Sequence, residues 1–242
     1  MFVKMKSWKT QNGFIIYKVL TGRSNSYLIS SQKNNILIDT GKKSAYTQLN
    51  RNINLLKLSN QKIAFLILTH THFDHCQSAE KFKEQNNCQI IVSEKALESI
   101  KKGYTILPNG TTLISKLISK IGKIIGKRKF GYQPFRPDIL ITENHDLKKL
   151  GDDVKIIETK GHSIDSISII IDNEIAVVGD AMFGIFKNSI FPPYADNVEE
   201  MIKSWEKLLN SDCHTFLPGH GKEVKRELLQ QEYDKYSLKY RV

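Results

Sequence analysis

The sequence has few of the features that mark secreted, membrane-spanning or repetitive proteins. Its 242 residues contain only three cysteines, Cys76, Cys88 and Cys213, and this odd, widely spaced set argues against a disulfide framework. No apolar run is long enough to span a bilayer, and no apolar stretch with a small-residue cleavage site stands at the N-terminus. No Gly/Ser-rich or Pro-rich linker divides the chain, and no short fixed repeat occurs. We therefore expect one cytoplasmic domain over residues 1–242 that is not bound to a membrane.

Acidic residues are also comparatively few. The chain has 36 Lys and Arg against 25 Asp and Glu, which gives a net charge of +11. This charge is compatible with an anionic small-molecule substrate, an anionic membrane surface or nucleic acid. Because the lysines are scattered along the whole chain, a general compositional bias explains them better than nucleic acid does. The oligomeric state is left open, a homodimer included.

Short β-like runs alternate with helix-like stretches in two successive halves. In the first half we expect strands at 14–20, 26–31, 36–39, 63–68 and 89–92 and helices at 43–58, 78–85 and 94–101, after a polar lead-in over residues 1–8. In the second half we expect strands at 154–159, 166–171, 174–178 and 215–217 and helices at 197–209 and 223–236. This order predicts an α/β sandwich of two mixed β-sheets with helices outside.

The segment at about 103–136 fits neither half and is expected to be a helical insertion near the active site. Leu113, Leu117 and Ile121 recur at helical spacing, with lysines on the neighbouring stripe, so an amphipathic basic helix is predicted. It is either an ordinary surface helix docked on the core or a lid or wall of the substrate pocket. The basic residues at 120–129 either attract an anionic substrate or form a solvated helix face.

The segment His70-Thr71-His72-Phe73-Asp74-His75 is the strongest signal for chemistry. In extended backbone, residues two apart point the same way, so His70 and His72 can hold one ion together. If the chain turns into a helix near Asp74, then Asp74 and His75 point to another side. The segment directly follows a buried strand, a loop position on a rigid scaffold where sites are commonly built.

Three more candidates each follow a predicted strand and stand beside a glycine. They are His162 in Lys160-Gly161-His162, Asp180 in Val178-Gly179-Asp180 and His220 in Pro218-Gly219-His220. Glycine lets the backbone approach closely, so that side chains from separate strands can converge. Each residue alone would more often be a loop residue, but together with the first cluster they predict a metal centre.

This pattern resembles the ligand set of the metallo-β-lactamase superfamily from about Phe14 to His220. The resemblance implies an αββα sandwich with the site along one edge. It assigns His70, His72 and His162 to one metal and Asp74, His75 and His220 to a second, with Asp180 bridging both. It also implies that Asp39 is a buried carboxylate that orients the ligand loops. The expected cofactors are two divalent metal ions, with zinc the first choice and iron or manganese as alternatives.

Departures from the family's best-known members narrow the expected activity. Those enzymes carry cysteine where this chain has Asp180, so antibiotic hydrolysis is not expected. Glyoxalase II has similar motifs but adds a helical C-terminal domain, whereas only residues 221–242 follow His220 here. Lactonases and small thioester or phosphodiester hydrolases remain.

The resemblance predicts a metal-dependent hydrolase in which a hydroxide held by two metals cleaves a small ester, lactone or thioester. Asp74 is the expected catalytic residue, a proton shuttle to the leaving group. The alternatives are a phosphodiesterase acting on nucleotides or nucleic acid and an iron-dependent oxidoreductase of the same fold. Tyr194 either donates a hydrogen bond to substrate or packs. We expect Cys76 to be a packed thiol, and His145 and His214 to lie outside the site.

Overall fold

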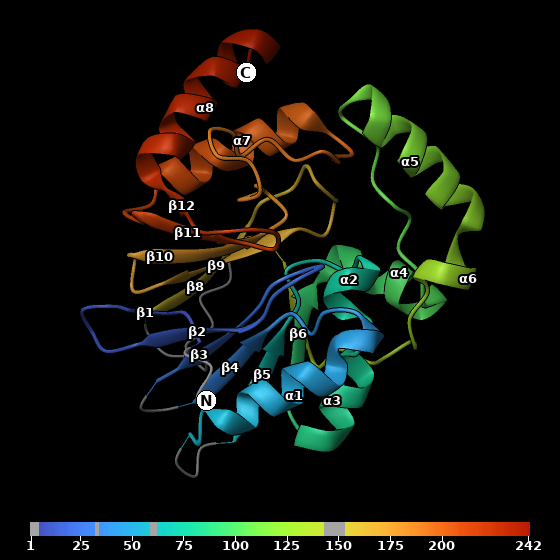
Figure 1. Cartoon of the computed structure of the whole chain (residues 1–242), viewed down its shortest axis with the longest axis vertical. Helices are drawn as coiled ribbons and strands as arrows, with labels where there is room; N and C mark the ends of the chain where they lie inside the picture. Colours follow the sequence, from blue (N-terminus) through green and yellow to red (C-terminus); the bar gives the residue numbers. More distant parts are fainter. Residues whose placement is uncertain (1–4, 32–33, 59–61, 143–152) are drawn as a thin grey trace.

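The computed structural model describes residues 5–31, 34–58, 62–142 and 153–242. Two β-sheets lie face to face in the middle of the molecule, and helices cover their outer faces (Figure 1). The α/β sandwich of two mixed sheets expected from the sequence is confirmed. Within the described ranges, no helix combines the length and the apolar character that crossing a membrane requires.

Seven strands of the described chain form the first sheet, and they follow one another in sequence order. They are β1 (Ser7–Lys9), β2 (Ile15–Leu20), β3 (Ser26–Ser30), β4 (Asn35–Ile38), β5 (Ile63–Ile67), β6 (Gln89–Ser93) and β7 (Ile139–Ile141). The first four pair antiparallel, and β4 to β7 pair parallel. The sheet is therefore mixed, with its parallel half on the side that carries the His70 segment.

The second sheet is formed by five described strands from the C-terminal half. In spatial order they are β12 (Val224–Lys225), β11 (Thr215–Pro218), β10 (Ile175–Gly179), β9 (Ile167–Ile171) and β8 (Val154–Glu158). Only β10 and β11 pair parallel. A tight turn joins β9 to β10, and both Asp172 and Asn173 in it have positive φ, as a type I′ hairpin requires.

The helices connect the strands along the chain, and most of them lie on the outer faces of the two sheets. They are η1 (Lys43–Ala45), α1 (Tyr46–Leu55), α2 (Phe73–Cys76), α3 (Ala79–Asn86), η2 (Glu94–Ala96), α4 (Leu97–Lys102), α5 (Leu113–Ile125), α6 (Lys127–Phe130), α7 (Val198–Leu209) and α8 (Arg226–Tyr240). In Figure 1, α1 and α3 flank the first sheet, α7 and α8 flank the second, and α5 stands apart at the right.

Three apolar layers hold this arrangement together. The central layer joins the inner faces of the sheets, where Ile16, Ile38 and Ile67 pack with Ile169 and Val177. A second layer fixes the helices α1, α3 and α4 on the first sheet, and a third fixes α7 and α8 on the second. The strands β9 and β10 are buried along their whole length, because one face meets the central layer and the other meets α7.

Three edge elements differ from the sequence prediction. The last two residues of the predicted polar lead-in, Ser7 and Trp8, belong to β1, and β7 was not predicted at all. The closing helix begins at Arg226 because Val224 and Lys225 first pair with β11 as the short strand β12. Edge strands of two or three residues carry too little hydrophobic alternation to be recognised from the sequence, since the neighbouring strand supplies their hydrogen bonds.

Candidate metal centre

The predicted ligands are brought together at one edge of the sandwich, where several strands end. His70 and His72 follow β5, His162 follows β8, Asp180 follows β10 directly, and His220 follows β11. Because the neighbours β10 and β11 are parallel, their carboxyl ends meet at the same edge. Asp74 and His75 lie in the single turn of α2, which redirects them as expected from the sequence.

The ligand atoms converge into three overlapping groups. Within each group all atoms lie within 4.8 Å of one another, and the groups are His70, His72 and His162; His70, His75 and Asp180; and Asp74, His75 and His220. The Asp180 carboxylate lies between them, with its Oδ2 3.5 Å from His162 Nε2 and 3.2 Å from His220 Nε2. The Asp180 carboxylate therefore lies close to a histidine of each of the two predicted ligand groups.

Four of the histidines have their outer ring nitrogen held by a protein oxygen. The pairs are His70 Nδ1 with Thr69 Oγ1 at 3.1 Å, His72 Nε2 with the Ile106 carbonyl at 3.2 Å, His75 Nδ1 with Asp39 Oδ2 at 2.8 Å and His162 Nδ1 with the Tyr194 carbonyl at 2.9 Å. A ring nitrogen that donates to an oxygen carries the proton, so the other nitrogen presents a lone pair. All four lone pairs therefore point into the centre.

The inner atoms are not satisfied by the protein itself, and this tests whether the site fits a metal. His70 Nε2, His75 Nε2 and Asp180 Oδ1 are buried without a hydrogen-bond partner. His72 Nδ1 and His162 Nε2, both expected to carry lone pairs, lie only 3.0 Å apart. Buried polar atoms without a partner are rare and destabilising. Imidazole nitrogens and carboxylates are ligands for zinc, iron and manganese, so this donor set fits divalent cations.

The electrostatics of the site favour neutral rings at His70 and His162 and an ionised carboxylate at Asp180. Burial lowers the pKa of His162 to about 4 and lowers the pKa of His70 well below its usual value. Burial acts to raise the pKa of Asp180, but the surrounding histidines, His220 first, hold it well below the usual range. Burial also acts to lower the pKa of His75, but Asp180 and Asp39 raise it on balance, so positive charge is favoured at this position.

Asp39 lies behind the ligands, where the resemblance places an orienting carboxylate. It is 2 % exposed and directly follows β4. Its carboxylate accepts hydrogen bonds from the Thr69 backbone N–H and hydroxyl, both at 2.8 Å, and from His75 Nδ1. Its φ of 60° is in the left-handed region that few residues adopt. These bonds fix the start of the ligand loop and the ring of His75.

Two glycines beside the ligands are required by close approach. A Cβ at Gly219 would lie 2.3 Å from Asp180 Oδ1 and 2.6 Å from His75 Cε1. A Cβ at Gly161, which has a φ of +129°, would lie 2.3 Å from the Met201 backbone nitrogen. Gly219 therefore allows the end of β11 to approach Asp180 and His75, as expected from the sequence, whereas Gly161 allows the loop of His162 to pack against α7.

Some residues of the site were not predicted from the sequence. Arg23 Nε donates to Asp74 Oδ2 at 3.2 Å from a side chain that is 60 % exposed. Asp165 accepts hydrogen bonds from the Thr71 backbone at 2.9 Å and from the Thr71 hydroxyl at 2.6 Å, and so holds the ligand loop from the second sheet. Nothing in the local sequence marks either residue, because both contacts depend on how distant segments fold together.

A cavity of about 340 Å³ opens beside the ligand cluster. Its wall combines the ligands His72, Asp74, His162, Asp180 and His220 with Arg23, Tyr194 and mainly apolar side chains, among them Phe73, Leu107, Pro108, Ile118, Phe130, Phe183 and Ile185. The segment 103–136 therefore forms part of the cavity wall. Tyr194 is half-buried there, while its backbone carbonyl holds His162.

The other predicted residues lie away from the cavity. Cys76 is buried, and its thiol donates to the Thr71 carbonyl. Burial raises the pKa of Cys76 well above its usual value, as expected for a packed thiol. His214 is exposed and its Nδ1 contacts the Thr215 hydroxyl. His145 lies outside the described residues.

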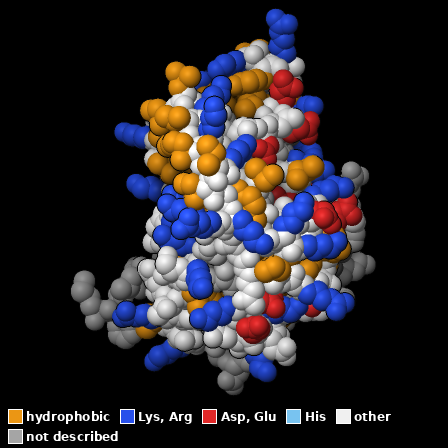
Figure 2. Space-filling model, turned by 90° about the vertical axis from the view of Figure 1, so that its right-hand side faces the viewer, with side chains coloured by type: hydrophobic (Ala, Val, Ile, Leu, Met, Phe, Trp, Pro, Cys, Tyr) orange, Lys and Arg blue, Asp and Glu red, His pale blue; other side chains and the backbone are white. Residues whose placement is uncertain are grey.

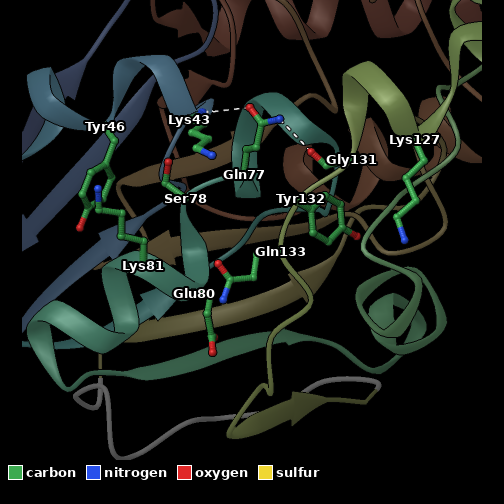
Figure 3. A pocket seen from close by; sticks show the side chains of 10 residues that line it. All are labelled: Lys43, Tyr46, Gln77, Ser78, Glu80, Lys81, Lys127, Gly131, Tyr132 and Gln133. Carbon is green, nitrogen blue, oxygen red and sulfur yellow. Dashed lines mark hydrogen bonds between the residues drawn. The ribbon is translucent and has the colours of Figure 1, made fainter.

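A second cavity of about 390 Å³ lies between η1, the start of α1, the turn from α2 into α3, and the segment 127–133 (Figure 3). None of the seven predicted ligands is among the residues that line it in the described chain. Gln77 bridges it, since its side chain accepts from the Lys43 backbone N–H at 2.9 Å and donates to the Gly131 carbonyl at 2.8 Å. These bonds fasten the end of the inserted segment beside the ligand helix.

The sequence of the chain matches the model of the metallo-beta-lactamase superfamily over residues 19–220, a range that contains all seven predicted ligands. The chain belongs to the metallo-beta-lactamase superfamily. The family membership predicted from the motifs is thereby confirmed, and with it a metallo-hydrolase. The match does not give the number of metal ions or their identity, so two ions and zinc stay predictions.

Curated relatives within the superfamily point the same way. The chain is 30% identical over 202 residues to a protein named as a probable metallo-hydrolase of Methanocaldococcus jannaschii, covering 82% of this chain and 87% of the relative. It is 24% identical over 210 residues to the beta-lactamase-like protein 2 homolog of Drosophila melanogaster, covering 87% of this chain but only 62% of that longer protein.

Solved structures of the superfamily show the same fold. A metallo-beta-lactamase of Cronobacter sakazakii superposes with a TM-score of 0.67 at 17% identity, over 93% of this chain and 90% of that chain. The subclass B3 enzyme BJP-1 of Bradyrhizobium japonicum superposes with a TM-score of 0.67 at 18% identity, over 96% of this chain and 91% of that chain. At these identities the likeness concerns the fold alone.

Proposed function

We propose that this chain hydrolyses a small ester, lactone or thioester with two divalent metal ions, most readily zinc. The observation that carries the proposal is the orientation of the histidine rings, whose inner nitrogens face the centre of the site. Four histidines have their outer nitrogens held by protein oxygens. Of their inner nitrogens, His70 Nε2 and His75 Nε2 are buried without a hydrogen-bond partner, and His72 Nδ1 and His162 Nε2 lie 3.0 Å apart. Such a preorganised donor set holds its geometry before any cation binds.

His70, His72 and His162 would hold one ion, Asp74, His75 and His220 the other, and Asp180 both. When bound, such a pair of ions lowers the pKa of a water molecule and polarises the bond that is cleaved. Although burial acts to raise the pKa of Asp74, His75 and His220 lower it on balance, which keeps the carboxylate ionised. From the cavity wall Asp74 can take a proton and pass it to the leaving group.

The cavity lining supports a substrate with an apolar part. Leu107, Ile118 and Phe183 face the same space as the ligands, and its volume of about 340 Å³ suits a small molecule. Apolar walls bind acyl or ring substituents and exclude water from the reacting bond.

A cytoplasmic location is part of the proposal and is supported by three buried, free cysteines.

Metal analysis of protein purified without chelators tests the dinuclear site. We expect about two divalent ions per chain in the unchanged protein and about one or fewer in a His72→Ala variant, because the first site loses one of three histidine ligands. His214→Ala, which changes an exposed histidine away from the cavity, serves as the matched control and should keep both ions. Equal metal content in all three proteins would contradict the proposal, and iron as the bound metal would favour an oxidoreductase.

A phosphodiesterase is a second candidate, and Arg23 is the observation that favours it. Its guanidinium lies on the cavity wall, and it pairs with Asp74 while remaining largely exposed. Arginine binds phosphate oxygens through two parallel hydrogen bonds, which a neutral lactone does not require.

An Arg23→Ala variant separates the two candidates. If the substrate is a phosphodiester, kcat/KM for bis-nitrophenyl phosphate should fall roughly 10- to 100-fold, since a charge-assisted hydrogen bond is lost. If the substrate is a neutral ester, lactone or thioester, its kcat/KM should change by only about threefold or less. Arg51→Ala, a change at an exposed arginine of α1, is the control for loss of surface charge.

A further inference from the structure

The helix α5 exposes its apolar face to solvent. Seven of its 13 residues are exposed Leu or Ile side chains, namely Leu113, Ile114, Leu117, Ile118, Ile121, Ile124 and Ile125. Leu113 and Ile124 are the most exposed, at 86% and 79%. The sequence left open whether this helix docks on the core with its apolar stripe, and the structure shows that it does not. A contiguous apolar stripe of this size on a protein surface marks an interaction site.

The outward orientation of the stripe is fixed by contacts on the opposite face of α5. Its buried residues are Ser115, Ser119 and Gly122. Ser119 Oγ donates to the Pro108 carbonyl at 2.6 Å, and a Cβ at Gly122 would lie 2.5 Å from Leu107 Cδ1. Turning the stripe inward would break this hydrogen bond and force large side chains into a space that admits only small ones. The apolar face therefore has no described part of the chain to cover it.

The charge around the stripe has one sign. No acidic residue occurs between Glu98 and Asp138 in the sequence. The exposed basic residues on α5 and α6 are Lys116, Lys120, Lys123, Lys127, Arg128 and Lys129. Figure 2 looks onto the side of the molecule where α5 stands, and hydrophobic side chains gather at its upper left with Lys and Arg around and below them.

We propose that the surface of α5 and α6 docks on an anionic lipid bilayer, with the Leu and Ile stripe entering the acyl boundary and the basic residues contacting the headgroups. Interfacial helices have this composition, an apolar face flanked by lysine and arginine, and they need no membrane-spanning length. Each basic residue near an anionic bilayer adds to the attraction. The sequence analysis named an anionic membrane surface only as compatible with the net charge and expected a domain that is not bound to a membrane.

Other occupants of this surface fit it less well. A second copy docked face to face would bring six cationic side chains on α5 and α6 against the same six, and like charges at an interface are destabilising. Nucleic acid would satisfy the lysines but would leave the Leu and Ile side chains against charged phosphates and water. An anionic bilayer satisfies both parts at once.

The docking surface adjoins the cavity beside the ligand cluster. Ile118 belongs to the exposed stripe and also lines the cavity beside the ligand cluster. A docked α5 would therefore hold the cavity next to the lipid surface. The docking itself does not rest on the proposed hydrolysis, because it can be measured without turnover.

Co-sedimentation with vesicles tests the proposal on the full chain. We expect binding to vesicles of phosphatidylcholine and phosphatidylserine and little binding to phosphatidylcholine alone. Lys116→Gln with Lys120→Gln should weaken binding roughly 25-fold, at about fivefold per lysine. Leu113→Gln with Ile124→Gln should weaken it roughly tenfold or more for each side chain. Neither pair lines the cavity, so turnover of a soluble substrate should be unchanged.

Matched variants elsewhere on the surface distinguish docking through α5 and α6 from nonspecific adsorption to vesicles. Leu238→Gln removes a leucine of α8 that is 82% exposed, and Lys9→Gln with Lys62→Gln removes two exposed lysines outside the segment. These variants should bind vesicles like the unchanged protein. The proposal is overturned if the unchanged protein does not bind anionic vesicles, if it binds neutral ones equally well, or if Leu113→Gln with Ile124→Gln instead dissolves a dimer. Binding to an oligonucleotide but not to vesicles would also overturn it.

Discussion

An Asp180→Asn variant should lose nearly all hydrolytic activity while keeping its fold. Among the described residues, Asp180 is the one side chain whose carboxylate approaches histidines of both predicted ion sites, His162 at 3.5 Å and His220 at 3.2 Å. Asparagine has the same shape but no charge, so it bridges two cations poorly. We expect kcat/KM to fall about 10³-fold, equivalent to about 4 kcal/mol of transition-state stabilisation, and metal content to fall below two ions per chain.

The matched control is Asp212→Asn, which makes the same chemical change at an exposed position outside the cavity. It should keep both metal content and activity. Thermal unfolding of the metal-free proteins checks that Asp180→Asn remains folded. Full activity in a folded Asp180→Asn variant would show that a shared carboxylate is not needed, and the two-ion mechanism would then have to be abandoned.

An Asp39→Ala variant should be strongly destabilised and should bind metal more weakly. The change leaves the Thr69 N–H, the Thr69 hydroxyl and His75 Nδ1 buried without their acceptor. Removing one partner of a buried, charged hydrogen-bonded pair lowers the free energy of unfolding by about 3–5 kcal/mol. Loss of a group that orients a ligand histidine lowers metal affinity roughly 10- to 100-fold. Chemical denaturation and metal titration measure the two effects.

Asp172→Ala is the control for the backbone part of this effect. Asp172 has a φ of 57°, close to the 60° of Asp39, so alanine meets similar strain at both positions. Its carboxylate accepts from Asn12 in an exposed turn and contacts none of the ligands. If both variants are destabilised equally, then left-handed backbone strain rather than the hydrogen bonds of Asp39 explains the loss.

Much of the candidate site could be predicted because its residues stand in short, recognisable sequence motifs. His70, His72, Asp74 and His75 form one short motif after a strand that is apolar throughout, and strand-end position plus an adjacent glycine identified the other three. The family resemblance then implied a site along one edge of the sandwich and a division of the ligands between two metals. The structure brings the seven side chains together in three overlapping groups, two of which have the predicted members, and their role as metal ligands stays a prediction.

The rest depends on contacts that a sequence does not display. Arg23 reaches Asp74 across 51 positions, and Asp165 reaches Thr71 across 94. Neither residue type nor spacing reveals such pairs. The orientation of α5 was also undetermined, because an apolar stripe normally turns inward. Here the small face of Ser115, Ser119 and Gly122 fits against the protein, and the stripe is left outside.

The distribution of the ligands over both sheets has a consequence for how the protein folds. His70, His72, Asp74 and His75 follow the first sheet, whereas His162, Asp180 and His220 belong to the second. No half of the chain carries a complete set, so high-affinity binding requires both sheets to be docked. If the predicted ligands bind metal, we expect metal uptake to follow assembly of the sandwich, and we expect free metal to shift the unfolding equilibrium toward the native state by mass action.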